Sequence, residues 1–187
     1  MPNILIPLLV ACFILATTQA QPKPNSLNSG DFDANPEMQR LARAFAGKWK
    51  THESFAKNEY YPNGAKRTGT AEIALATGGT SLVENVHSEG SAGKLEFMVV
   101  IWWDGAENVY KLFTCGNSGL SPCRVRGTAR WEGANFVNEY ELTIRGKSHK
   151  AKDSFEEISP RSFTLVASAA LSPAGMGPII TTTYTRQ

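Results

Sequence analysis

The sequence predicts an all-β protein, a single antiparallel up-and-down barrel of about ten strands preceded by one short helix. Three observations lead to this prediction. From Gly47 onward, apolar residues recur at every second position, which is the side-chain period of a strand with two unlike faces. Short turn signals separate these runs, and helical spacing occurs only before them. Closing so many strands into a barrel removes the edges that an open sheet would expose.

Length and composition limit the functions that need to be considered. The chain has 187 residues and a formal net charge of +2, and 42% of its residues are hydrophobic. These values suit one globular domain and exclude a mainly disordered chain. Nucleic-acid binding requires a basic surface, and the near-neutral net charge of this chain gives no indication of one. We therefore expect no nucleic-acid partner.

Residues 1–20 have the features of a cleaved signal peptide. The segment Ile4–Ala16 is almost wholly apolar, and small residues at Thr18 and Ala20 match the spacing of a signal-peptidase site. The apolar run is too short to span a bilayer as a stable helix. The sequence therefore predicts cleavage after Ala20, export to the periplasm or the extracellular space, and no transmembrane segment in the mature chain.

A second interpretation of this segment concerns Cys12. The run Leu9-Val10-Ala11-Cys12 resembles a lipoprotein signal, whose cysteine becomes the lipidated first residue of the mature chain. The apolar run continues past Cys12, whereas such a signal normally ends at its cysteine. Lipidation at Cys12 stays open beside the simpler interpretation that this cysteine lies inside the signal peptide.

The barrel domain is expected over residues 35–187, after a flexible tether at residues 21–34 that is rich in proline, asparagine, serine and glycine. Its first element is a short helix that could plug one end of the barrel. Asn35 is a good N-cap, and Pro36 suits the first helical position. Gly47 provides a stop. One face of this helix carries Met38, Leu41, Ala42 and Phe45.

Strands are expected to fill the rest of the domain. Runs with clear alternation cover residues 70–75, 95–103, 124–131, 136–145 and 163–171. The turn signals between the runs include Pro62-Asn63-Gly64, Gly78-Gly79, Gly90 to Gly93, Asp104-Gly105, Glu132-Gly133, Arg145-Gly146 and Ser159-Pro160. Asn-Gly and Asp-Gly supply the positive φ angles of tight hairpins, so an antiparallel meander is the economical topology.

Two cysteines, Cys115 and Cys123, remain once the signal peptide is removed. The residues between them are rich in turn formers, and strand-like runs flank them. An oxidising compartment favours their pairing, so a structural disulfide across a hairpin is predicted. A redox-active pair is the alternative, although such cysteines usually lie closer together at a helix N-terminus.

Several short pieces of the sequence, taken in order, resemble a family of uncharacterised and often exported bacterial domains with a calycin-like, that is lipocalin-like, β-barrel. The pieces are Phe45–Trp49, Gly78–Glu84, Trp102–Asp104, Gly127–Gly133 and Tyr184–Arg186. The resemblance implies a calycin-like barrel and no established activity. In lipocalins, a tryptophan of the first strand closes the barrel floor under a basic side chain of the last strand. The resemblance gives these structural roles to Trp49 and Arg186.

No motif for catalysis or for metal binding occurs in the sequence. His52, His87 and His149 lack metal-ligand spacing, no Gly-x-Ser-x-Gly elbow is present, and no glycine-rich phosphate loop precedes a helix. We therefore expect no metal and no resident cofactor, and no catalytic residue can be named. A haem held by a single histidine has no local signature in a sequence and stays open.

Three arginines, Arg124, Arg126 and Arg130, share one face of a predicted strand. The simpler interpretation puts them on the outer face, where they could pair with acids such as Glu139 and Glu141 on the neighbouring strand. The opposite face suits the barrel interior better; it carries Val125, Gly127, Ala129 and Trp131. The alternative is that the arginines point inward and bind an anion or a carboxylate.

The aromatic residues of the central strands suggest an apolar cavity with a few polar groups, as small-molecule sites usually have. The predicted lining residues are Glu84, His87, Phe97, Trp102, Tyr110, Trp131 and Tyr140. The favoured hypothesis is an exported barrel that holds a small apolar or amphipathic molecule. The alternatives are a hydrolase or isomerase that uses the same cavity, and a filled barrel that contacts other proteins through an outward Trp102 or Trp103.

Overall fold

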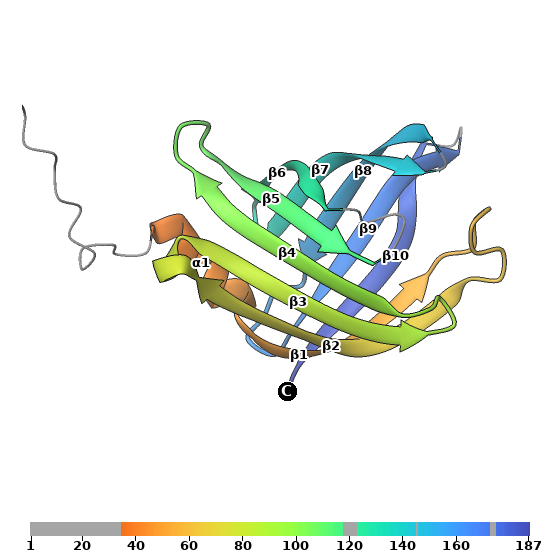
Figure 1. The fold of residues 1–187 in the computed structure, drawn as a ribbon, viewed down its shortest axis with the longest axis horizontal. Coiled ribbons are helices and arrows are strands. Elements are labelled where there is room, and N and C mark those ends of the chain that lie inside the picture. The colour runs from red at the N-terminus through yellow and green to blue at the C-terminus, as the bar shows by residue number, and fades with distance from the viewer. Residues whose placement is uncertain (1–34, 118–122, 145, 173–174) are drawn as a thin grey trace, which may run out of the picture. The chain divides into compact units, whose positions relative to one another are not determined.

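The computed structural model describes residues 35–117, 123–144, 146–172 and 175–187. The predicted signal peptide and tether, with Cys12, lie outside the described residues. Within them the chain forms one α-helix followed by a closed antiparallel barrel of ten strands, which confirms the predicted fold class (Figure 1).

The helix α1 (Pro36–Phe45) begins where the sequence predicts it. The side chain of Asn35 accepts a hydrogen bond from the backbone N–H of Glu37 at 2.8 Å, which satisfies one free donor of the first turn. The helix ends before Ala46, which is already extended. Its buried face consists of Met38, Leu41 and Phe45.

Each strand pairs with the next one along the chain, and β1 pairs with β10 to close the barrel. The closing pairs run from Trp49 opposite Arg186 to Phe55 opposite Ile180. A short 3-10 turn (Thr77–Gly79) links β2 to β3. The strands are β1 (Gly47–Phe55), β2 (Ala65–Ala76), β3 (Ser81–Gly90), β4 (Leu95–Asp104), β5 (Val109–Gly116), β6 (Arg124–Glu132), β7 (Asn135–Ile144), β8 (Lys147–Glu156), β9 (Ser162–Ser172) and β10 (Gly175–Arg186).

The helix α1 lies at one end of the barrel (Figure 1). Aromatic side chains pack together at this end. The ring of Phe45 is the centre of this cluster. It lies 5.1–6.1 Å from the rings of Trp131, Phe136, Phe155 and Phe163. Such tilted and stacked aromatic pairs are favourable beyond the area that they bury. We call this filled region the helix end.

Trp49 and Arg186 meet at the helix end in the way that the resemblance implies. The guanidinium carbon of Arg186 lies 4.3 Å from the centre of the Trp49 ring. A side chain at Gly47 would put its Cβ 2.3 Å from Arg186 Nη1, so only glycine lets the guanidinium lie there. The indole N–H of Trp49 donates to the carbonyl of Phe45 at 2.9 Å, which joins the helix to the first strand.

A β-bulge interrupts β6. Arg126 and Gly127 together lie opposite Leu112 of β5, so β6 carries one residue more than its partner at this point. Gly127 adopts a φ of 62°, the left-handed conformation that favours glycine. An extra residue reverses which side chains face inward on one side of the bulge.

The bulge corrects the prediction for the arginines of this strand. Arg124 lies opposite the buried Thr114, and Arg126 lines the barrel interior. They share the inner side with Ala129 and Trp131, which lie beyond the bulge. The predicted outer position was therefore wrong for Arg124 and Arg126. It was right for Arg130, whose exposed side chain pairs with Glu139 at 3.0 Å.

Replacing Gly127 with alanine is expected to destabilise the fold strongly. The new Cβ would lie 2.1 Å from the carbonyl oxygen of Glu139, and alanine would also have to adopt a left-handed conformation. The conformation alone costs about 1–2 kcal/mol. Gly133 has a φ of 63° but open space around it, so Gly133→Ala isolates that cost. Urea denaturation should show a clearly larger loss for Gly127→Ala, and equal losses would mean that the bulge tolerates a side chain.

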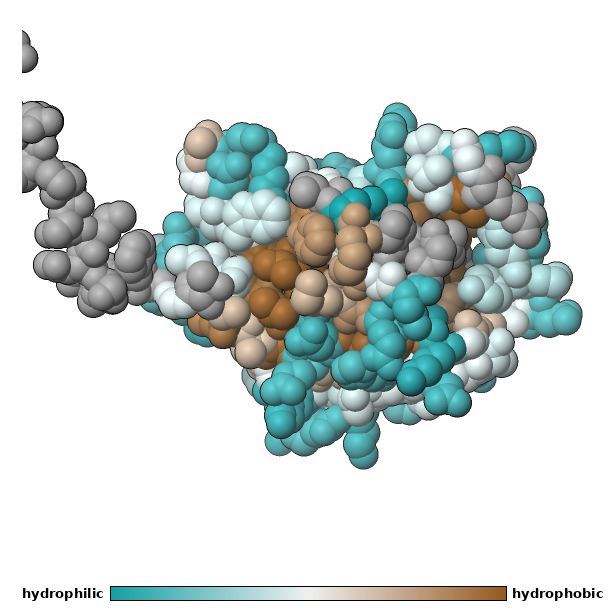
Figure 2. Space-filling model, viewed as in Figure 1, coloured by the Kyte–Doolittle hydropathy of each residue, from teal (hydrophilic) through white to brown (hydrophobic). Residues whose placement is uncertain are grey.

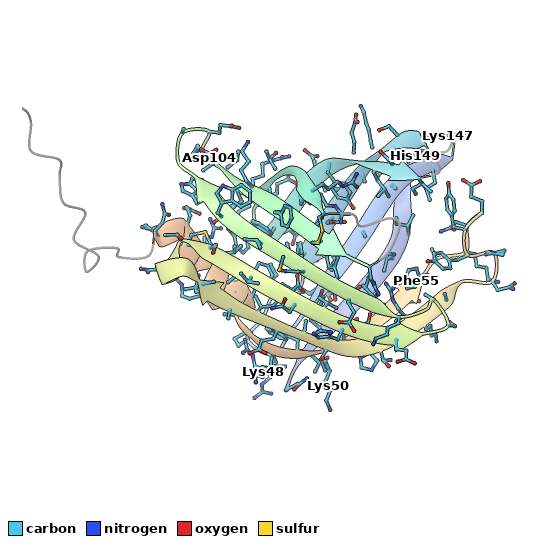
Figure 3. The ribbon with its side chains drawn as sticks, viewed as in Figure 1. Lys48, Lys50, Phe55, Asp104, Lys147 and His149 are labelled. Atoms are coloured by element: carbon cyan, nitrogen blue, oxygen red, sulfur yellow. A yellow bond between two sulfur atoms is a disulfide. The ribbon has the colours of Figure 1, made fainter. Side chains whose placement is uncertain are left out.

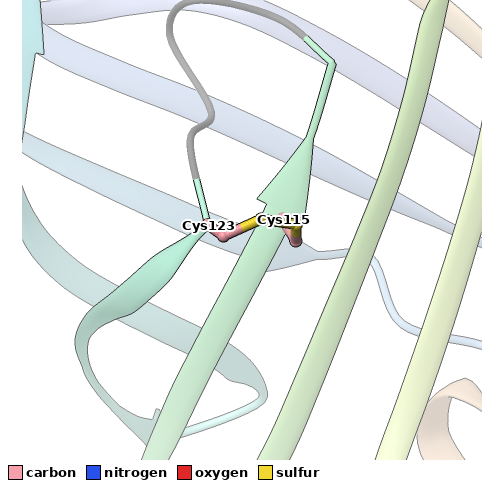
Figure 4. The surroundings of a disulfide bond; sticks show 2 residues. All are labelled: Cys115 and Cys123. Carbon is pink, nitrogen blue, oxygen red and sulfur yellow. A yellow bond between two sulfur atoms is a disulfide. The ribbon is translucent and has the colours of Figure 1, made fainter.

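The predicted disulfide between Cys115 and Cys123 is present (Figure 4). It joins the end of β5 to the start of β6, which is the strand that carries the bulge. On the outer side of the barrel, apolar residues gather over β4 and β5 with hydrophilic residues around them (Figure 2). No helix within the described part of the chain is long and apolar enough to cross a membrane.

Candidate functional site

Two adjoining cavities lie inside the barrel, beyond the aromatic cluster. The inner cavity has a volume of about 70 Å³, and the outer cavity one of about 370 Å³. The outer volume alone falls in the range of small-molecule sites, roughly 300–1,000 Å³. Phe55, which lines the outer cavity, lies toward the end of the barrel far from Asp104 and α1 (Figure 3). Five residues line both cavities: Phe97, Arg126, Asp153, Leu165 and Tyr184.

Most of the inner wall is apolar. Aliphatic and aromatic side chains from eight strands and from α1 form it, so a ligand there would lose most of its contact with water. Examples are Ile73, Leu82, Val99, Ile101, Leu112 and Phe155. The few polar groups in this wall therefore decide which molecules fit, because an unpaired polar group is costly in such surroundings.

The first polar group is Arg126, which lies beside Gly127 in the bulge of β6. Its guanidinium carbon lies 3.8 Å from the ring centre of Tyr140. Its Nη2 lies 3.6 Å from Oδ2 of Asp153, which is an ion pair longer than a hydrogen bond. The hydroxyl of Tyr140 donates to Asp153 Oδ1 at 2.9 Å. Burial raises the pKa of Asp153, although Arg126 and the hydrogen bonds from Tyr140 and Asn138 oppose this.

Several buried polar atoms beside Arg126 have no hydrogen-bond partner in the described structure. They include Nε of Arg126, Oγ1 of Thr114 and Oδ1 of Asn138, and all three residues line the inner cavity. Nη2 of Arg124, opposite Thr114 in the sheet, is also buried without a partner. Native proteins leave few such groups unsatisfied, so a cluster of them at one cavity is a feature that calls for an explanation.

The second polar group is Glu84 of β3, which also lines the inner cavity. Its side chain is buried, and Oε1 accepts a hydrogen bond from the hydroxyl of Tyr184 at 3.0 Å. Burial raises the pKa of Glu84 from 4.5 to about 7, although the bond from Tyr184 opposes this. Burial and the neighbouring Glu84 also raise the pKa of Tyr184, which stays protonated.

A third polar group lines the outer cavity. Arg67 of β2 donates to Glu53 Oε2 through Nε at 3.1 Å and through Nη2 at 2.5 Å. The hydroxyl of Ser88 donates to the other oxygen of Glu53 at 2.6 Å. The guanidinium of Arg67 lies 4.8 Å from the ring centre of Phe55. Both oxygens of Glu53 are thus engaged within the protein.

Glu84, Phe97 and Tyr140, which the sequence predicts as cavity residues, do lie in the cavity walls. Tyr110 and Trp131 do not, because both are used at the helix end. The hydroxyl of Tyr110 donates to the Glu37 carboxylate at 2.7 Å, and Trp131 Nε1 donates to Tyr110 at 3.2 Å. These two aromatics fasten α1 to the barrel.

His87 and Trp102 lie on the outer side of the barrel, so their predicted place in the cavity was wrong. His87 is exposed and pairs with the carboxylate of Glu96. Trp102 lies between Ile101 and Trp103 on β4, and both of these neighbours pack in the core. Because successive side chains of a strand point to opposite faces, Trp102 points outward. Trp102 was predicted there for its aromatic ring and His87 as a polar anchor, but the register of each strand decides which face a side chain takes.

The three histidines are apart from the cavity walls. His52 is exposed on β1. His149 is partly buried on β8, and its Nδ1–H donates to the carbonyl of Ala170 at 3.0 Å. No histidine lines either interior cavity. Among the described residues there is no cluster of three or more His, Cys, Asp or Glu side chains that could hold a metal ion.

The sequence prediction missed Asp153, Asn138, Arg67 and Tyr184, and placed Arg126 outside. A signal for Arg126 was available, since an isolated glycine within a strand often marks a bulge. Asp153 offered none, because it lies in a run of mixed polar residues whose inward face becomes clear only from its pairing with β7 and β9.

Comparison with known proteins identifies the fold. No protein-family model matches the chain, and no curated protein matches it. The chain is similar to the solved structure of Rv2717c from M. tuberculosis, with a TM-score of 0.57 and 16% identity, over 83% of this chain and 99% of the other. It is also similar to the S-type phycobiliprotein lyase CPES from Guillardia theta, with a TM-score of 0.53 and 11% identity, over 80% of this chain and 92% of the other. At these identities the likeness concerns the fold alone, and the chain has the calycin-like barrel fold.

Proposed function

We propose that this protein binds a small amphipathic carboxylic acid inside its barrel, with the carboxylate on Arg126 and the apolar tail toward the outer cavity. The observation that carries the proposal is the position of Arg126. Its guanidinium lines both cavities, and its Nε is buried without a partner. A guanidinium with a free donor in an apolar wall is well suited to a carboxylate.

The ion pair with Asp153 does not use all of the hydrogen-bonding capacity of Arg126. The nitrogen–oxygen distance of 3.6 Å is too long for a hydrogen bond from Nη2 to Asp153, and Nε has no partner among the described residues. The pKa of Asp153 is raised, so part of its population is protonated at a higher pH than for an ordinary aspartic acid. A ligand carboxylate could therefore take the main share of the charge of Arg126.

The charges around the cavities also favour an anion. Arg126, Arg67 and Lys94 contribute positive charge to the walls, and Glu53 is already engaged by Arg67. The remaining acids, Asp153 and Glu84, both have raised pKa values. An anionic head group therefore meets an excess of positive charge near neutral pH.

Replacing Arg126 with leucine is expected to weaken the binding of decanoate by about 30-fold or more. Loss of a buried charged partner typically costs about 2–5 kcal/mol in a complex, and about 1.4 kcal/mol is a factor of ten. Isothermal titration calorimetry with decanoate measures the change. Decanol, which has the same tail without the charge, should bind both proteins with similar affinity.

Arg130→Leu is the matched control, because Arg130 lies on the same strand with its side chain exposed on the outer face. It should bind decanoate as the wild type does. Circular dichroism confirms that each variant is folded. The proposal fails if the wild type does not bind decanoate, or if Arg126→Leu and Arg130→Leu behave alike.

Export belongs to the same proposal. The sequence of residues 1–20 has signal-peptide features, and a disulfide joins Cys115 and Cys123. Together they support a function in the periplasm or outside the cell, as in the often exported bacterial domains that the sequence resembles. Once exported, the protein would lie beside the membrane into which amphipathic acids partition, and it would bind its ligand there.

A further inference from the structure

We propose that Glu84 is a second polar anchor of the inner cavity, and that the preferred ligands are amphipathic acids with a hydroxyl group close to their carboxylate. This inference rests on the proposed function, because Arg126 has to hold the carboxylate. The inference specifies which class of acid the site prefers, and it names Glu84 as the residue that recognises the hydroxyl group.

The small size of the inner cavity places the two anchors near one head group. Glu84 and Arg126 both line this cavity, and its volume of about 70 Å³ holds only a few non-hydrogen atoms. They come from β3 and β6, with β4 and β5 between them in the barrel. A carboxylate on Arg126 therefore carries its next carbon atoms along the wall that contains Glu84.

Glu84 has hydrogen-bonding capacity that the protein does not use. Tyr184 donates to Oε1 at 3.0 Å, and within the described residues it is the one side chain whose hydrogen bond acts on the pKa of this carboxyl group. The side chain is only 9% exposed, and apolar residues such as Leu82 and Val99 surround it. A methylene group packed against Oε2 would leave this oxygen desolvated and unpaired, at a cost that a hydroxyl group avoids.

A hydroxyl group suits this position better than a charged one. Burial favours the protonated form of Glu84, and Tyr184 keeps its own proton, so the wall offers neutral donors and acceptors. A hydroxyl both donates and accepts, and pairs with either protonation state of Glu84. An ammonium group would meet the positive charge of Arg126, and a second carboxylate would meet the acid itself.

The test compares three ligands by isothermal titration calorimetry at pH 6: decanoate and the two enantiomers of 3-hydroxydecanoate. One enantiomer should bind the wild type about tenfold more tightly than decanoate, as expected for one added buried hydrogen bond. The enantiomers have the same charge and the same hydrophobicity. A difference in their affinities therefore shows that the protein contacts the hydroxyl group at a defined position. Enantiomers can be distinguished only when the carboxylate, the hydroxyl group and the tail are all held in place.

The double variant Glu84→Leu/Tyr184→Phe removes both partners of the internal hydrogen bond and leaves neither unpaired. It should lose the tenfold preference for the hydroxy acid over decanoate, and this ratio of affinities within the variant is the readout. Glu84→Gln, which keeps donor and acceptor, should retain the preference. Glu72→Leu, which removes an exposed acid on β2, is the control for the loss of a carboxylate and should change nothing.

The outcomes separate this inference from the proposed function. If the wild type binds decanoate and both hydroxy acids equally, Glu84 is not an anchor, and Arg126 can still hold the carboxylate. The inference is also overturned if the double variant keeps the preference. If no acid binds the wild type, the proposed function and the inference fail together. The ligand comparison on the wild type decides the matter even if the double variant does not fold.

Discussion

Alanine in place of Trp49 is expected to lower the free energy of unfolding by about 3–5 kcal/mol, the cost of emptying a large aromatic site in a packed core. Trp49 has no exposed surface. Its ring packs against Phe163 at 4.9 Å and under Arg186 at 4.3 Å, and its indole N–H bonds to the carbonyl of Phe45. The substitution leaves a cavity, removes the hydrogen-bond donor of the Phe45 carbonyl and removes the ring beneath Arg186. Urea denaturation followed by circular dichroism measures the loss.

Trp102→Ala is the matched control for this variant. It removes the same side chain from β4, where the strand alternation directs it to the outer face. We expect a much smaller loss of stability, because no cavity forms inside the barrel. If the two substitutions destabilise the protein equally, Trp49 does not have the special role at the barrel floor that we assign to it.

The protein is expected to become less stable as the pH rises from about 4.5 to about 7, by about 3 kcal/mol from Glu84 alone. In the unfolded chain this acid ionises near its ordinary pKa of 4.5, whereas burial keeps it protonated in the fold up to about pH 7. Its stabilising contribution is therefore complete below pH 4.5 and is lost as the pH rises through 7. The raised pKa of Asp153 acts in the same direction.

Glu84→Gln separates this effect from the other titrating groups, because it removes the ionisable group at nearly constant volume. The groups that share the cavity walls with Glu84 are unchanged in this variant; they include Tyr184, Arg126, Asp153 and Glu53. Urea denaturation at a series of pH values should show the wild type losing stability relative to the variant between pH 4.5 and 7. Parallel stability curves would contradict a buried, protonated Glu84.

The fold could be predicted because its signals are local. Period-two alternation and frequent turns gave the ten-stranded barrel, and a capped amphipathic stretch gave α1. The disulfide could be predicted because its two cysteines flank a single hairpin. Each of these features depends on residues close together in the chain, so no knowledge of distant pairing was needed.

The site could be predicted only in part, because it depends on which face each strand turns inward. The bulge at Gly127 brought Arg126 into the barrel, although strict alternation placed it outside. Asp153 lies among lysines and serines, a pattern typical of an exposed strand. His87 and Trp102 were chosen for their residue type, and their registers turn them outward. Glu84 and Phe97 were placed correctly because their strands alternate without interruption.

The measurement that tests the central claim most directly is the carboxyl resonance of ¹³C-labelled decanoate bound to the protein. A carboxylate inside the barrel on Arg126 should give a separate bound signal in the wild type and in Arg130→Leu. That signal should not follow the titration of the free acid, because the buried guanidinium holds the bound group ionised. It should disappear in Arg126→Leu. A bound signal that titrates like the free acid, or that survives unchanged in Arg126→Leu, would contradict the account.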